Sequence, residues 1–354
     1  MYNSFAIWYD KEENKEEKDN CVAELHFNLW QFTSRGKWWQ FISKGKSSNT
    51  DFLDVGLKIT DIENVKNIKF FIPLDVGDSG VRDLGGVIES TPHLIQAIFN
   101  ESYEVHPKPG KKIKVTLKNS KQETFNVYSL DEADISNIKE GNDGTTITIS
   151  LNGIKVDDDS TVAYLRLRFD LKKSEVQDKI IHTSTPKDGL IKSSVIKEQL
   201  IDFRFNEARN LPKKINENIK GQAFLVKKIH FFIIRELTDK LLTYGNGLNE
   251  YRVLENDTWR PYVNDHDAPK LNHMIAYHWK KKSKDGGCIK NFIISSKFSY
   301  SSSSWIKIFK YLLIGILLGA AGGIAGNLST DLLTSNDLKT ENHISDSIVL
   351  KDDN

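Results

Sequence analysis

The chain has 354 residues, and its 49 Lys and Arg residues nearly balance its 48 Asp and Glu residues, which gives a formal charge of +1. A hydrophobic content of 39% and a charged content of 27% are typical of folded protein and exclude an intrinsically disordered chain. Two cysteines, Cys21 and Cys288, exclude a disulfide framework, and the balanced charge argues against a nucleic acid as partner.

The first 19 residues are predicted to form an exposed N-terminal arm. Acidic and basic side chains alternate between residues 10 and 20 without apolar side chains, which is typical of a solvated segment. The arm also lacks the cationic start and apolar stretch of a secretory signal. We therefore expect the N-terminal part of the chain to stay in the cytoplasm.

Residues 20–172 are predicted to form a mainly β cytoplasmic domain. Apolar and polar side chains alternate in several short segments, most regularly over residues 163–170, and this period of two indicates strands with one buried face. Turn clusters such as residues 141–144 separate the segments, which favours an antiparallel sandwich or barrel. One helix is expected where Thr91 and Pro92 precede an apolar stripe.

A second β-containing domain is predicted over residues 199–298. Residues 173–198 have no sustained period and are interpreted as a linker between the two domains. Residues 299–310 are rich in serine and are interpreted as a juxtamembrane tether. The expected fold class is therefore mainly β, with antiparallel sandwich-like domains, some helix and one C-terminal transmembrane helix.

Residues 311–330 are predicted to span a membrane. They contain no charged side chain, and 20 helical residues at ~1.5 Å each cover the ~30 Å hydrocarbon core of a bilayer. A buried helix of a soluble protein is the alternative, but each of the five glycines in this segment would destabilise such a helix by up to ~1 kcal/mol relative to alanine. The polar and acidic residues 331–354 are expected to be a disordered tail.

The distribution of lysines predicts the orientation of the span. Eight lysines lie between residues 280 and 310, whereas only Lys339 and Lys351 follow the apolar segment. Because positive charge accumulates on the cytoplasmic side, this favours a single-pass protein of the cell inner membrane whose N-terminus is cytoplasmic.

Two kinds of membrane contact are predicted. Four glycines spaced by four, three and four residues share one face of the helix, which would let a second copy approach closely. Four lysines just upstream could contact anionic lipid headgroups, although a role in topology alone or a solvated loop explains them equally well. The glycines are Gly315, Gly319, Gly322 and Gly326, and the lysines are Lys280, Lys281, Lys282 and Lys284.

Catalytic signals are weak. One candidate metal set combines imidazoles with a carboxylate, ligands that suit zinc or iron, but its spacing matches no established ligand motif and a structural loop explains it as well. It comprises His266, Asp267, His273 and His278. We assign no catalytic residue and no cofactor, because neither cysteine has a nearby histidine and no nucleophile elbow occurs.

These features together suggest a membrane-anchored recognition or effector protein rather than an enzyme. The β domains would bind a protein or a small molecule, and binding would control self-association of the glycine-faced helix into a homo-oligomer. A role in bacterial antiviral defence is a hypothesis from architecture alone. The alternatives are a membrane-tethered metal-dependent hydrolase and a passive membrane scaffold.

Overall fold

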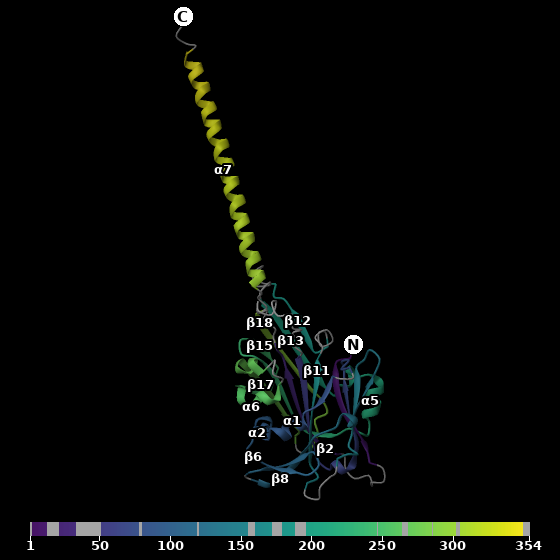
Figure 1. The fold of residues 1–354 in the computed structure, drawn as a ribbon. Coiled ribbons are helices and arrows are strands. Elements are labelled where there is room, and N and C mark those ends of the chain that lie inside the picture. Colours follow the sequence, from purple (N-terminus) through teal and green to yellow (C-terminus); the bar gives the residue numbers. More distant parts are fainter. Residues whose placement is uncertain are drawn as a thin grey trace. The chain divides into compact units, whose positions relative to one another are not determined.

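The computed structural model describes residues 2–12, 21–32, 51–77, 80–118, 120–154, 160–171, 179–187, 196–245, 247–263, 268–284, 286–301 and 305–349. Within these residues the chain is mainly β, with two sheets and one long C-terminal helix, which confirms the predicted fold class (Figure 1). The chain divides into two units, one of Met1–Ser34 with Lys46–Ser301 and one of Arg35–Gly45 with Ser302–Asn354.

Both sheets belong to the first unit. The first sheet has the strand order β15 (Lys240–Tyr244), β18 (Phe292–Ser301), β13 (Ile196–Phe205), β1 (Ser4–Lys11), β4 (Val65–Ile72), β10 (Thr145–Ser150) and β9 (Ile135–Lys139), and β12 (Ile181–Ser184) also pairs with β13. The second has the order β16 (Leu248–Val253), β17 (Met274–Lys282), β14 (Leu225–Glu236), β2 (Val22–Trp30), β3 (Asp51–Ile59), β11 (Ala163–Leu171), β8 (Ser120–Tyr128), β7 (Lys112–Leu117) and β6 (Tyr103–Lys108), and β5 (Val81–Asp83) also pairs with β11.

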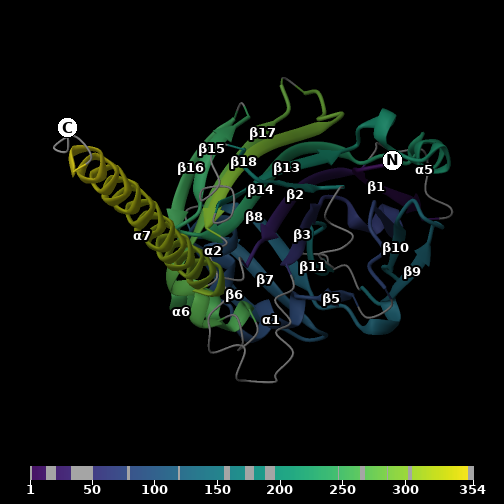
Figure 2. The same cartoon turned by 90° about the horizontal axis from the view of Figure 1, so that it is seen from above.

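Short helices complete this unit and cover the outer faces of the sheets. α1 (Gly85–Ser90), α2 (Leu94–Phe99) and α6 (Asn256–Trp259) pack on the second sheet (Figure 2), while α5 (Lys213–Ile219) packs on the first. Short 3-10 turns occur at η2 (Ile62–Asn64), η3 (Glu132–Asp134), η4 (Ala208–Asn210), η5 (Arg260–Tyr262) and η6 (Ala268–His273).

The main core lies between the two sheets. Along β2, Ala23, Leu25, Phe27 and Leu29 are buried in this core, whereas Trp30 on the opposite face packs under the helices. The alternation follows from the strand geometry, since successive side chains point to opposite faces. The outer face of the second sheet is therefore a second, covered surface, and polar side chains at alternate positions lie on it.

Two sets of four core strands are placed in the two sheets in the same way, although β15 and β16 interrupt the second set. In the first set, β1 and β4 lie in the first sheet and β2 and β3 lie in the second. In the second set, β13 and β18 lie in the first sheet and β14 and β17 lie in the second. β1 pairs in parallel with β13, and β2 pairs in parallel with β14. Residues 25–29 (LHFNL) align with residues 229–233 (IHFFI), so that His26 lies opposite His230 and Phe27 opposite Phe231.

This pairing changes the predicted domain organisation. We expected separate β domains over residues 20–172 and 199–298, but each sheet contains strands from both regions, and they form one compact unit. The predicted linker also contributes a strand, β12. The period of two indicates a strand and its buried face but carries no information about a parallel partner far away in the sequence.

The predicted N-terminal arm is another difference. Most of its described part is β1, a central strand in which Phe5, Ala6, Ile7, Trp8 and Tyr9 are each at most 3% exposed. Both faces of β1 are covered, one by the main core and the other by α5, so an uninterrupted apolar run replaces alternation. Residues 13–20, which carry much of the charge pattern, lie outside the described residues.

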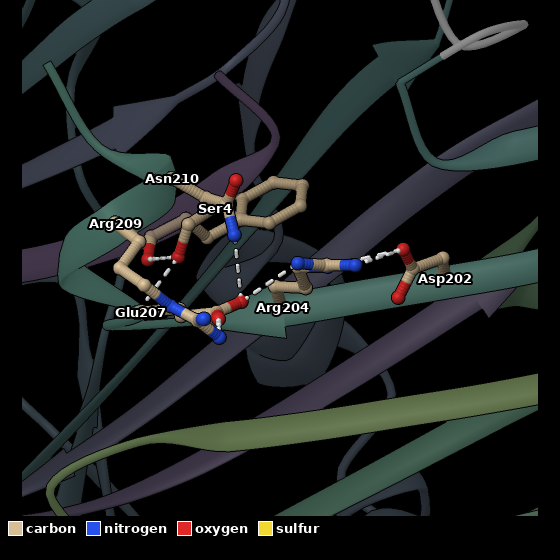
Figure 3. Close-up of polar contacts among 7 residues, drawn as sticks. Ser4, Asp202, Arg204, Glu207, Arg209 and Asn210 are labelled. Atoms are coloured by element: carbon tan, nitrogen blue, oxygen red, sulfur yellow. Dashed lines mark hydrogen bonds and ion pairs between the residues drawn. The ribbon is translucent and has the colours of Figure 1, made fainter. Parts of the chain in front are cut away.

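A polar network holds the start of β1 against the end of β13 (Figure 3). The buried Glu207 carboxylate accepts hydrogen bonds from Arg204 Nη1 (2.9 Å), Arg209 Nη2 (2.7 Å) and Asn210 Nδ2 (2.8 Å). The backbone N–H of Glu207 donates to Ser4 Oγ (3.0 Å). The bond to Ser4 joins β1 to the segment after β13, and the other contacts fix the Glu207 side chain beside it.

The second unit contains α7 (Trp305–Val349), and the stretch Phe309–Leu333 of this helix is long and apolar enough to cross a membrane. None of that stretch is buried, and it includes the predicted span 311–330. The helical backbone continues through the predicted tail as far as Val349. In the predicted tether, β18 ends at Ser301 and α7 begins at Trp305, and residues 302–304 lie outside the described residues.

A buried charged cluster lies on the outer face of the second sheet. Arg168 Nε and Nη2 donate to the two carboxylate oxygens of Asp54 (2.7 and 3.1 Å), and the Tyr262 hydroxyl donates to Asp54 Oδ2 (2.7 Å). Arg166, which is fully buried, donates to the hydroxyls of Tyr262 (2.5 Å) and Tyr164 (2.8 Å). Asp54 therefore pairs directly with Arg168, and the Tyr262 hydroxyl links it to Arg166.

We predict that Asp54→Asn lowers the free energy of unfolding by about 3–5 kcal/mol, because it leaves the buried Arg168 guanidinium without its carboxylate partner. The measurement is denaturant unfolding of the full-length protein in detergent micelles. Asp170→Asn is the control, since its ion pair with Arg82 is exposed and should contribute less than about 1 kcal/mol. Equal losses for both variants would contradict the interpretation.

Candidate functional site

Three histidines on adjacent strands form the centre of the candidate site. His26 lies on β2, His230 on β14 and His278 on β17, all on the outer face of the second sheet. The strand register brings them together: His26 is opposite His230, and His278 is opposite Phe232, two residues farther along β14. Because side chains two residues apart share a face, the three imidazoles become neighbours.

These imidazoles line a pocket of about 210 Å³, which we call the histidine pocket. The second sheet forms its floor, and residues at the end of α2, in β6 and in β7 form its wall. Its lining consists of Glu24, His26, Lys58, Ala97, Ile98, Phe99, Asn100, Glu101, Tyr103, Leu117, Lys228, His230, Phe232, Glu250, Arg252, His278 and Lys280.

A chain of hydrogen bonds links two of the imidazoles to a carboxylate. Glu250 Oε1 lies 3.1 Å from His278 Nδ1, and His278 Nε2 lies 2.9 Å from His230 Nδ1. A carboxylate accepts, so His278 Nδ1 donates to it and the Nε2 atom of a neutral His278 accepts from His230. The neutral tautomer of His230 therefore has its proton on Nδ1 and a lone pair on Nε2.

The third imidazole is more deeply buried. His26 is 4% exposed, and its ring makes edge contacts with Phe99 (centroids 5.1 Å apart) and with His230 (4.9 Å). Within the described part of the chain, its Nδ1 atom has no hydrogen-bond partner. A buried polar atom without a partner costs free energy, which makes His26 the most unusual polar group of the pocket.

All three imidazoles are neutral at physiological pH. Burial, together with smaller contributions from His278 and Lys228, lowers the pKa of His230 from 6.5 to about 3. Burial also lowers the pKa of His26 well below its ordinary value. The pKa of His278 is lowered by burial even though Glu250 opposes the change.

Lysines surround the neutral imidazoles. Lys228 Nζ lies 3.4 Å from Glu24 Oε2, and Lys58 Nζ lies over the Phe125 ring, 4.8 Å from its centroid. Burial lowers the pKa of Lys280, and repulsion from Lys228 and Lys282 lowers it further. Neighbouring cations that lower the pKa of Lys280 create a positive local potential around it, which is electrostatically suited to an anion.

The structure places the four lysines predicted to contact lipid headgroups in different surroundings. Lys280 lines the histidine pocket, while the neighbouring Lys281 donates from Nζ to the carbonyl oxygen of Asn291 (2.9 Å). Lys282 ends β17 and Lys284 is exposed in the connection to β18. This connection adjoins the start of β18, whereas Ser301 is at the other end of that strand. Contact of these lysines with lipid headgroups stays a prediction.

The predicted metal ligands are only partly described. His266 and Asp267 lie outside the described residues, His273 is exposed at the end of η6, and both ring nitrogens of His278 are engaged by Glu250 and His230. Among the residues that the structure describes, no group of three or more His, Cys, Asp or Glu side chains is placed to hold a metal ion. The four-residue metal set stays a prediction.

The predicted glycine face lies on α7. A Cβ atom added at Gly315, Gly319, Gly322 or Gly326 would meet no atom within 4 Å. The hydroxyls of Ser329 and Thr330 donate to the Gly326 carbonyl oxygen (2.7 and 2.9 Å), so the helix itself provides partners for these polar groups. This arrangement is compatible with a lipid environment, where water provides no alternative partner. Self-association through the glycines stays a prediction.

Sequence reasoning missed most of the histidine pocket. It singled out His278 and Lys280 for other roles and did not consider His26, His230, Lys228 or Glu250. The available signal is the repeated pattern of residues 25–29 and 229–233, in which histidine and phenylalanine occupy equivalent positions. That pattern becomes informative only when the two strands are known to be paired.

Comparison with protein-family models and with curated proteins finds no match. The function must therefore be inferred from the chemistry of the pocket and of the helix.

We predict that the protein loses stability as the pH is lowered from about 6.5 toward about 3. In this range an unfolded histidine binds a proton, whereas folded His230, with a pKa of about 3, does not, so acid favours the unfolded state. Thermal unfolding in detergent at a series of pH values measures the effect. His230→Asn should flatten the profile, and the control His106→Asn, at an exposed histidine, should leave it unchanged.

Proposed function

We propose that this protein is a single-pass membrane protein whose β unit recognises a ligand in the cytoplasm and whose C-terminal helix self-associates. The observation that carries the proposal is the apolar stretch Phe309–Leu333 of α7, none of which is buried. The wider hypothesis of a bacterial defence effector rests on architecture alone, and we develop only the parts that particular residues support.

The distribution of apolar side chains on α7 favours lipid as their environment. Successive residues of a helix point about 100° apart, so Ile316, Leu317 and Leu318 reach different sides, and each is at least 59% exposed. A helix that is apolar on every side requires either a protein interior or a membrane. At ~1.5 Å per residue, its 25 residues extend about 37 Å, enough for a ~30 Å hydrocarbon core with some tilt.

The glycine face supports self-association within the membrane. Lipid provides no hydrophobic force between helices, and association therefore depends on close packing, which glycines permit. A Cβ added at these positions meets no atom within 4 Å, so the described part of the chain leaves room for the start of a larger side chain. A loss of oligomers caused by a larger residue at these positions would consequently indicate contact with another helix.

The orientation prediction can be tested with the natural cysteines, since Cys288 is exposed and Cys21 is buried. In right-side-out membrane vesicles, we expect an impermeant maleimide to label Cys288 only after permeabilisation, because the β unit faces the cytoplasm. The paired variant carries Cys288→Ser and Ser345→Cys and should be labelled without permeabilisation. The reverse pattern would invert the orientation, and recovery of the protein outside the membrane fraction would refute the span.

The glycine face can be tested by replacing Gly319 and Gly322 with isoleucine. We expect crosslinked oligomers of the full-length protein in membranes to decrease at least about tenfold, equivalent to about 1.4 kcal/mol, because backbones can no longer approach closely. Ala320→Ile is the control, since it enlarges a side chain on another side of the same turn.

Each outcome of the isoleucine experiment selects a function. Loss of oligomers in the glycine variant alone supports a self-associating recognition protein. Unchanged oligomers would mean that close helix packing is irrelevant and would favour the passive scaffold. Equal loss in the glycine variant and in Ala320→Ile would indicate general disturbance of the helix and would also contradict a specific glycine interface.

A further inference from the structure

We propose that the histidine pocket binds a small molecule through a phosphate-like dianionic group held between Lys228, Lys280 and the imidazoles of His26 and His230. This inference rests on the recognition part of the proposed function and names the class of ligand. It does not require self-association of α7, so each can fail separately.

The first support is the concentration of cations on one side of the pocket. Lys58, Lys228 and Lys280 come from three strands of the same sheet and all line the cavity. Glu24 pairs with Lys228 and Glu250 with His278, whereas Lys280 makes no ion pair with another described residue. A dianion would relieve the repulsion among the lysines, and partial desolvation would strengthen its attraction to them.

The second support is the histidine at the floor of the pocket. His26 is 4% exposed and lines the cavity, and its Nδ1 atom has no hydrogen-bond partner within the described residues. Next to it, the chain from Glu250 through His278 leaves His230 Nε2 without a proton in the neutral state. Each ring could donate to an anionic oxygen once the appropriate nitrogen carries a proton.

The third support is the size and composition of the cavity. Its volume of about 210 Å³ lies below the roughly 300–1,000 Å³ of pockets for drug-sized ligands, which favours a small molecule over a polymer. Phe99 and Phe232 line the same cavity, so an apolar part attached to the anion would contact aromatic rings. A polynucleotide would instead need an extended cationic groove.

Binding of a dianion should be coupled to proton uptake by His230. With a proton on Nε2, the ring becomes an imidazolium that donates to the ligand through Nε2 and to His278 through Nδ1. An adjacent dianion favours this charged form and raises its pKa. The charged groups that lower the pKa of His230 are Lys228 from β14 and Lys280 and Lys282 from β17. The other charged groups that line the pocket are Glu24 from β2, Lys58 from β3, Glu250 and Arg252 from β16, and Glu101 after α2, and Arg166 from β11 acts on His26.

Calorimetric titration of the full-length protein in detergent with inorganic phosphate and with sulfate tests the proposal. Sulfate is the sharper probe, because its charge is constant between about pH 6 and about pH 8, where a histidine can titrate. We expect both anions to bind, and we expect the affinity for sulfate to increase toward pH 6 by at most about tenfold per pH unit. Buffers with different ionisation enthalpies should reveal the proton taken up.

Two lysines of the same strand provide matched variants. Lys280→Gln removes a charge inside the pocket, whereas Lys281→Gln removes the same charge on the opposite face of β17. We expect Lys280→Gln to weaken sulfate binding at least about tenfold, or about 1.4 kcal/mol, and Lys281→Gln to change it less than about twofold. Lys228→Gln should repeat the loss, which guards against a folding defect in a single variant.

Absence of sulfate and phosphate binding would overturn the proposal, as would equal effects of Lys280→Gln and Lys281→Gln. If sulfate bound without proton uptake and His230→Asn did not change its affinity, His230 would not be part of the site. That result would contradict the proposed arrangement. None of these results would alter the crosslinking of the glycine variant. The proposal of an anion site can therefore fail while the proposal of a self-associating helix holds, and the reverse is also true.

Discussion

The parallel pairing of β2 with β14 is the interaction on which the rest of the β unit depends. It brings together two parts of the chain that are far apart in sequence, and the parallel contact of β1 with β13 accompanies it in the other sheet. Because the register aligns Phe27 with Phe231 toward the core, it must align His26 with His230 on the outer face. A slip of one residue would bury the histidines between the sheets and destroy both core and pocket.

The outer face of the second sheet shows two solutions to the problem of burying polar groups. At Asp54, Arg168 and Tyr262, hydrogen bonds and a bidentate ion pair hold the charges at fixed positions, as a buried network requires. In the histidine pocket, burial favours the neutral form of the imidazoles, and Lys58, Lys228 and Lys280 line the same cavity. The first arrangement is complete without a ligand, whereas the second encloses space beside its cations.

The C-terminal helix follows a different physical rule from the β unit. Its apolar side chains extend in all directions and none of the stretch Phe309–Leu333 is buried, so its stability as a folded element depends on the surrounding solvent. In the proposed membrane environment, lipid would surround the apolar side chains, and the helix itself provides partners for the hydroxyls of Ser329 and Thr330. The glycines would then offer a surface on which close packing, rather than hydrophobicity, makes association selective.

By itself, the sequence determined the features that depend on local composition. The uncharged run of residues 311–330 indicated the apolar helix, and alternation over residues 163–170 indicated a strand with one buried face, because both signals are properties of neighbouring residues. Only the tertiary structure decided that β1 is central rather than an exposed arm, that the two predicted β domains share their sheets, and that His26, His230 and Glu250 meet at one pocket. Those outcomes depend on pairing between distant strands, and the energy of such a pair lies in packing and register that no single segment encodes.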